Sequence, residues 1–391
     1  MTKTEQEFLQ ILRAAVLGEP LPEGFSVGEA GALFALARRH DLGHLLSVAL
    51  EGTALSRDSE LFARSERERL RALWRSGVLS HEEERVTAFL DREGIPYIPL
   101  KGAVVRALWP EPWMRTSCDL DILVREEDAG RAALLLCREL GYTARGETYH
   151  NHSLYSEGDA VHLELHFSLT EGGTSDAVLA RAWEHATPAD GARYVLSPEF
   201  LLFHLVSHLA THLLNGGGGV RPIVDVFLVR QQLAYDAAGF AELAREAGLL
   251  TFSEAVFSLS EAWLGEGEPA PVSERLGAAL LGGRLYSDTD RRAAVEKARR
   301  TGREARREAR RARRRYFRAR LFPGRDRLRV LYPALERHAF LLPFCYLHRL
   351  VRLLFGRRLA LALERGRASA GVTEEEKTEA LALLSSLGLM P

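Results

Sequence analysis

Residues 100–124 read LKGAVVRALWPEPWMRTSCDLDILV, and the end of this stretch decides the fold. The last six residues, DLDILV, alternate acidic and apolar side chains, which predicts a strand with two different faces over 119–124. Because side chains two positions apart on a strand share a face, Asp119 and Asp121 should lie side by side. The preceding residues 95–100 (IPYIPL) form a short apolar run between two glycines, which is typical of a buried strand. The stretch therefore predicts part of a small sheet with an acidic pair on one face.

The flanking sequence predicts that this sheet is small and that helices surround it. Residues 126–140 have apolar positions at helical spacing and are followed by Gly141, which suits the end of a helix. Residues 152–156 and 161–167 alternate again and are separated by Glu-Gly-Asp, a hairpin signal. Most of the remaining chain has helical periodicity. The predicted fold is therefore α+β and mainly helical, with a small mixed-sheet core embedded in helical N- and C-terminal regions.

Changes in the sequence pattern predict four regions. An N-terminal helical region is expected over residues 1–93, the sheet-containing core over 94–170, a helical domain over 171–289 and a C-terminal helical region over 290–391. The last region contains an arginine-rich segment, residues 291–320, with fifteen Lys and Arg residues against three Glu. This segment predicts either a solvated helix or a surface that contacts RNA or another polyanion.

The bulk composition excludes several classes of protein. A hydrophobic fraction of 46% and a charged fraction of 27% are ordinary for a globular chain and argue against disorder. A formal net charge of −1 excludes a nucleic-acid binder that works by overall charge alone. Three widely spaced cysteines suggest neither a disulfide framework nor a zinc site, and the sequence shows neither a signal peptide nor an apolar run long enough to span a membrane. The sequence thus predicts a cytoplasmic protein without a transmembrane segment.

Asp119 and Asp121 are the first candidates for chemistry. Two adjacent carboxylates repel each other unless a cation lies between them, and Mg²⁺ is bound by one or two carboxylates together with substrate phosphates. The alternative is an exposed strand face with two solvated acids. Glu164 favours the metal site, because it lies in the alternating segment VHLELHF with His162 and His166 on the same face. A third carboxylate from a neighbouring strand would complete a two-metal site.

Lys101, Gly102 and Arg115 are candidates for binding phosphate. Lys101 and Gly102 lie at a predicted strand-to-helix turn, where free backbone N–H groups and the helix dipole favour an anion. A glycine there lets a phosphate approach the backbone closely. Arg115, four residues before Asp119, could neutralise phosphate charge. Lys101 could instead pack against the sheet with its ammonium group in solvent.

Three histidines recur every four residues on a later predicted helix, at His204, His208 and His212. We interpret them as polar residues that line a cleft between the helical domain and the core, with metal ligation as the alternative. A zinc-protease motif needs a Glu directly after the first His, and this helix lacks one. Asp225 is predicted to have a structural role, as a cap or as a partner of Arg221.

The order of these motifs resembles the DNA polymerase β-like nucleotidyltransferase superfamily, in which a glycine-containing turn precedes an Asp-x-Asp strand and a third acid follows on a later strand. More narrowly, the chain resembles the bacterial "nucleotidyltransferase family protein" group. The matching words are Leu100-Lys101-Gly102, Arg115 before Asp119-Leu-Asp121, Leu140-Gly141-Tyr142 and Glu164-Leu-His166. The resemblance spans about residues 8–355 and is most specific over 100–166. One departure is that the superfamily usually has Gly-Ser at the turn, where this chain has Lys-Gly followed by alanine.

The resemblance implies a polymerase β-like core and metal-dependent nucleotidyl transfer, in which an acceptor attacks the α-phosphate of an NTP and pyrophosphate leaves. The implied catalytic metal ligands are Asp119, Asp121 and Glu164, with Mg²⁺ as the expected ion and Mn²⁺ as an alternative. The implied substrate-binding residues are Lys101, Gly102, Arg115 and His166. The acceptor stays open among a sugar, an antibiotic, a peptide, a protein side chain and an RNA end. The alternative function is a degenerate fold that serves as a non-catalytic nucleotide- or RNA-binding regulator.

Overall fold

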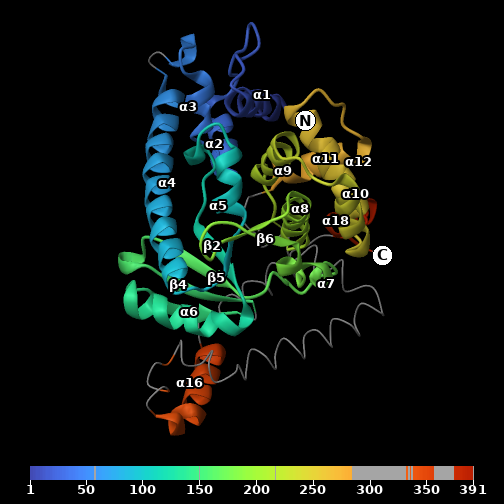
Figure 1. The fold of residues 1–391 in the computed structure, drawn as a ribbon. Coiled ribbons are helices and arrows are strands. Elements are labelled where there is room, and N and C mark those ends of the chain that lie inside the picture. The colour runs from blue at the N-terminus through green and yellow to red at the C-terminus, as the bar shows by residue number, and fades with distance from the viewer. Residues whose placement is uncertain are drawn as a thin grey trace.

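Figure 1 shows a computed structural model of the chain, and the residues that it describes are 1–56, 59–148, 150–215, 217–283, 332, 335, 338–355 and 374–390. The described part is mainly helical and contains a five-stranded mixed sheet and a separate two-stranded sheet. The predicted α+β, mainly helical fold class is therefore confirmed. The arginine-rich segment 291–320 lies outside the described residues.

Most of the helices pack around one large apolar core. Those before the sheet are α1 (Lys3–Leu17), α2 (Ala30–Arg39), α3 (Leu45–Leu50) and α4 (Glu60–Arg92). Those after it are α7 (Asp176–Leu179), α8 (Pro198–Leu214), α9 (Arg221–Gln232), α10 (Ala237–Glu246), α11 (Leu250–Leu264), α12 (Pro271–Gly282) and α18 (Glu374–Ser386). Cys345 of α16 (Leu342–Phe355) packs instead in a separate small apolar cluster with Leu335. The sequence predicts one or two helices over the span of α4, and the structure has one. Ser59 caps this helix and no proline interrupts it.

The five-stranded sheet brings the two predicted acidic strands together. Its order is β1 (Tyr97–Pro99), β2 (Asp119–Val124), β5 (His162–His166), β4 (Asn151–Tyr155) and β3 (Thr143–Glu147). β2 and β5 are parallel neighbours, whereas the other pairs are antiparallel. The parallel register places Asp121 opposite Glu164 and Asp119 opposite His162. The acids of both strands therefore lie on one face of the sheet.

The two faces of the sheet have different environments. Leu120, Ile122 and Val124 of β2 are buried in a second apolar core, to which α4 and α6 (Glu126–Glu139) contribute. The opposite face carries Asp119 and Asp121 and looks toward the short helix α5 (Lys101–Val105) and α8. The apolar face holds the strands in register, and the polar face carries the candidate functional side chains.

The sequence did not predict three of the strands. β3 reads TARGE, which has no apolar alternation, because it is an edge strand with little to bury. β6 (Ala186–Pro188) and β7 (Tyr194–Leu196) form the two-stranded sheet and are three residues each, too short to show a period of two.

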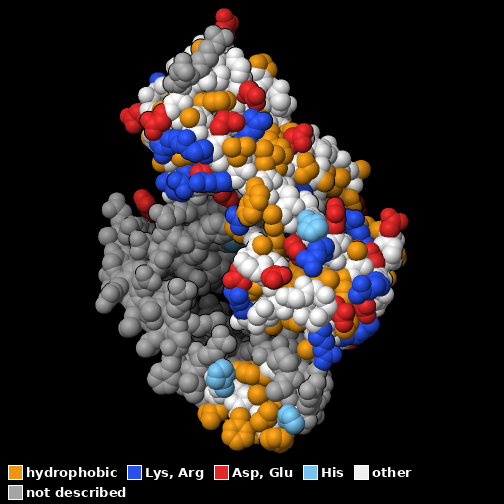
Figure 2. All heavy atoms as spheres, turned by 90° about the vertical axis from the view of Figure 1, so that its left-hand side faces the viewer, with side chains coloured by type: hydrophobic (Ala, Val, Ile, Leu, Met, Phe, Trp, Pro, Cys, Tyr) orange, Lys and Arg blue, Asp and Glu red, His pale blue; other side chains and the backbone are white. Residues whose placement is uncertain are grey.

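The surface in Figure 2 mixes charges of both signs: Lys and Arg side chains are interspersed with Asp and Glu. Apolar side chains gather at its lower end, in the region of α16, where Phe340, Phe344 and Leu347 are exposed. Among the described residues, no helix combines the length and the apolar character needed to cross a membrane.

Candidate functional site

Glu164 lies close to each of the two predicted aspartates, in two separate groups of side chains. Side-chain ligand atoms of Asp121, Glu164 and His166 lie within 4.8 Å of one another, and so do those of Asp119, His162 and Glu164. Glu164 belongs to both groups, because it lies on the strand next to the acidic pair. Within the described part of the chain, these are the two clusters of His, Cys, Asp and Glu that could hold a metal ion. Neither includes the histidines of α8.

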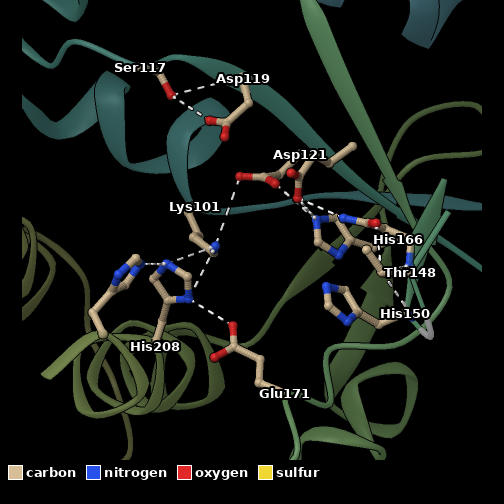
Figure 3. Close-up of polar contacts among 12 residues, drawn as sticks. Lys101, Ser117, Asp119, Asp121, Thr148, His150, His166, Glu171 and His208 are labelled. Carbon is tan, nitrogen blue, oxygen red and sulfur yellow. Dashed lines mark hydrogen bonds and ion pairs between the residues drawn. The ribbon is translucent and has the colours of Figure 1, made fainter. Parts of the chain in front are cut away.

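His166 contacts two of these carboxylates, and Figure 3 shows it beside Asp121. Its Nε2–H donates to Oδ1 of Asp121 at 2.9 Å and lies 3.3 Å from Oε2 of Glu164. The side-chain amide of Asn151 donates to the same Glu164 oxygen at 2.8 Å. Burial lowers the pKa of His166, but the two carboxylates outweigh it and raise that pKa to about 9. At neutral pH His166 is therefore a cation that occupies the centre of the acidic group.

The two aspartates are in opposite electrostatic situations. Burial, followed by the charge of Asp121, raises the pKa of Asp119. Burial also acts to raise the pKa of Asp121, but the nearby positive charges of Lys101 and His166 hold it well below its usual range. Nζ of Lys101 lies 4.0 Å from Oδ2 of Asp121. Asp119 is thus the carboxylate that most lacks a positive partner, and a divalent cation would supply one.

Gly102 is close-packed, so the structure gives a reason for a glycine at this position that the sequence did not reveal. A Cβ at this position would lie 3.0 Å from Oγ of Ser117 and 3.4 Å from Nη1 of Arg115. Ser117 in turn donates to the backbone and side chain of Asp119. α5 has only five residues, so its dipole adds little attraction for an anion. Phosphate attraction at this turn therefore depends mainly on side-chain charge.

Arg115 lies beside Gly102, and its positive charge is paired with a buried carboxylate. Its Nε and Nη2 donate to the two carboxylate oxygens of Asp225 at 2.8 and 2.7 Å, and both side chains are buried. Nε1 of Trp109 donates to Asp225 as well. The predicted partner of Asp225, Arg221, donates instead to the backbone carbonyl of Thr116, so that pairing was wrong. The substrate-binding role of Arg115 stays a prediction.

Two of the α8 histidines, His208 and His212, lie on the Lys101 side of the site, and their role in lining a cleft stays a prediction. Nζ of Lys101 lies 3.2 and 3.4 Å from the two ring nitrogens of His208, whose Nδ1 donates to Glu171 at 2.9 Å. His212 lies 2.7 Å from His208, nitrogen to nitrogen. Burial lowers the pKa of His212 to about 3 and holds that of His204 well below its usual range, so both are neutral.

Sequence reasoning missed Glu171. It follows β5 in a loop rather than in a periodic segment, and its partner His208 is 37 residues away. The one feature of the sequence that could have indicated Glu171 is that it follows shortly after β5, the strand that carries Glu164.

Comparison with protein families places the chain in one family. A family model described as "Uncharacterised nucleotidyltransferase" matches residues 27–265, which contain the sheet, both carboxylate strands and α8. The chain belongs to this family. No curated protein and no solved structure matched it. Membership of this nucleotidyltransferase family supports nucleotidyl transfer as the general activity and an NTP as the substrate.

Proposed function

We propose that this nucleotidyltransferase moves a nucleoside monophosphate from an NTP to an acceptor that carries a hydroxyl or phosphate group, and releases pyrophosphate. The observation that carries the proposal is that Glu164 lies within 4.8 Å, ligand atom to ligand atom, of both Asp119 and Asp121 on the neighbouring parallel strand. Hard oxygen ligands of this kind suit Mg²⁺, with Mn²⁺ as an alternative that also accepts histidine nitrogen. A bound ion would neutralise phosphate charge and lower the pKa of the acceptor hydroxyl.

The side chains around the carboxylates have defined parts in this proposal. Lys101, 4.0 Å from Asp121, would have its ammonium group available to the phosphates when a divalent ion takes over the carboxylate. His166 would give up its proton as the ion arrives, because it shares Asp121 and Glu164 with the metal site. In the metal-free protein these two cations stabilise a group of carboxylates that would otherwise repel one another.

Labelled nucleotides test the proposed transfer. The protein is incubated with Mg²⁺ and each of the four NTPs in a cell extract that supplies the acceptor. We expect label in the α-phosphate to move to an extract component, and label in the γ-phosphate to leave as pyrophosphate. Transfer of γ-label to the acceptor would instead show a kinase. Tight NTP binding without any transfer would favour the non-catalytic regulator.

Divalent-ion affinity is expected to rise with pH. Below a pKa of about 9 the metal-free site holds the His166 proton, and the ion must displace it. Competition with one proton strengthens binding by up to about tenfold per pH unit between 7 and 8.5, and the gain ends above the pKa. Mn²⁺ titration followed by electron paramagnetic resonance measures this slope. His166→Gln should flatten it, and an unchanged slope in that variant would contradict the assignment.

A further inference from the structure

A polar cluster lies beside the carboxylates and is not explained by metal binding. It consists of Lys101, Glu171, His208 and His212, and we refer to it as the lysine–histidine cluster. Figure 3 shows Lys101 between its two sides, with Asp121 on one and His208 on the other. The cluster is partly buried: the Lys101 side chain is 16% exposed and that of His208 is 27% exposed.

Lys101 is held in a conformation that a lysine rarely adopts. Its φ is +20°, at the edge of the left-handed region, where a side chain is disfavoured. Strained residues of this kind persist when the surroundings determine them, and they concentrate at functional sites. Here backbone hydrogen bonds fix the turn, from Leu100 N–H to the carbonyl of Asp121 and from Ala103 N–H to the carbonyl of Leu100. The far end of the Lys101 side chain contacts Asp121 and both ring nitrogens of His208.

Glu171, the hydrogen-bond partner of His208, is itself held in place by a third residue. The carboxylate of Asp176 accepts hydrogen bonds from the backbone N–H groups of Glu171, Gly172 and Gly173. This anchors the loop that carries Glu171. Burial would raise the pKa of Glu171, but His208 and Lys101 lower it well below the usual range, so the carboxylate is ionised. His208 therefore has a fixed anion at Nδ1.

We propose that His208, backed by Glu171, is a positioning residue that keeps the Lys101 ammonium group aimed at the phosphates of the bound NTP. This inference rests on the proposed function. With Nδ1–H given to Glu171, Nε2 of His208 has one lone pair, which faces Nζ of Lys101 at 3.2 Å and Nε2 of His212 at 2.7 Å. An imidazole acceptor holds the ammonium group without neutralising it, unlike a carboxylate.

The role follows from what a divalent ion does to Asp121. When the ion takes this carboxylate, Lys101 loses its anionic partner. A lysine side chain without a partner spreads over many rotamers, and fixing it again on a phosphate costs conformational entropy. His208 removes most of that cost, because it holds the ammonium group in place before the NTP arrives.

A double-mutant cycle on the full-length protein tests the inference, with Mg²⁺-tripolyphosphate as the probe in calorimetric titrations. Lys101→Met keeps the side-chain stem and removes the charge, and should weaken binding about 10- to 100-fold, the range for a charged hydrogen bond. His208→Phe keeps a ring and removes the acceptor, and should weaken binding about tenfold. Because His208 acts through Lys101, the double variant should bind no more weakly than Lys101→Met alone.

The control and the contrary outcomes separate this inference from the proposed function. Ser207→Ala lies on the same helix, next to His208, and should bind the probe as wild type does. Independent, additive losses in the double variant would overturn the positioning role, and so would wild-type binding by His208→Phe. Wild-type binding by Lys101→Met would overturn it together with the phosphate role of Lys101. In each case the metal site stands if Asp119→Asn still abolishes Mg²⁺-dependent binding.

Discussion

Asp119→Asn and Asp121→Asn are each expected to lower nucleotidyl transfer on the order of 10³-fold, because each removes charge that would hold the catalytic ion. Their effects on stability should have opposite signs. Asp119 has a raised pKa, so its ionised form is unfavourable in the fold, and Asn at this position should keep or increase the melting temperature. Asp121 is bonded to His166 and lies near Lys101, so Asn there should cost about 2 kcal/mol.

Activity and thermal unfolding measured on the same preparations test both halves of this prediction. Glu127→Gln, an exposed acid in the first turn of α6, is the matched control and should change neither quantity. Retention of full activity by either Asp variant would show that the catalytic site lies elsewhere. Equal losses of stability in both variants would contradict the electrostatic difference between the two aspartates.

Asp225→Ala is expected to cost about 3–5 kcal/mol of the free energy of unfolding, the range for a buried charge that loses its partner. The change leaves the guanidinium of Arg115 buried beside Gly102 and removes the acceptor of Trp109. Urea unfolding followed by circular dichroism measures the loss. A loss of unfolding free energy this large from one substitution would show that the ion pair joins α9 to the turn before β2.

The double variant Arg115→Met with Asp225→Leu serves as its control. Removing both charges and keeping apolar volume is often nearly neutral, so most of the lost stability should return. It also keeps the test informative when the single variant does not fold. A single variant as stable as wild type would contradict the account of Arg115 as a structural cation.

The acidic strands could be predicted from the sequence because a period of two fixes which side chains share a face. DLDILV and VHLELHF each show that period, and their pairing brought Asp121 opposite Glu164. Asp225, by contrast, was given a structural role as a cap or as a partner of Arg221, whereas its partner in the structure is Arg115, 110 residues away. Local spacing carries no information about such a contact.

The contacts of the lysine–histidine cluster could not be predicted from local spacing either. The spacing of the α8 histidines predicted that they share a helix face, but not that His208 meets Lys101, 107 residues earlier in the chain. Glu171 lies in a loop, where no periodicity indicates the direction of a side chain. Lys101 itself was left between phosphate binding and a position in solvent, and the structure places its ammonium group between Asp121 and His208.

We expect Asp119, Asp121 and Glu164 to bind a divalent ion together with the phosphates of an NTP. Anomalous diffraction from crystals soaked with Mn²⁺ and a non-hydrolysable ATP analogue tests it most directly. We expect Mn²⁺ bound to these carboxylates and to phosphate oxygens, at about 2 Å, with Lys101 on the phosphates and His166 no longer donating to Asp121. Mn²⁺ bound elsewhere, with Lys101 and His166 still on Asp121 in the presence of the nucleotide, would contradict it.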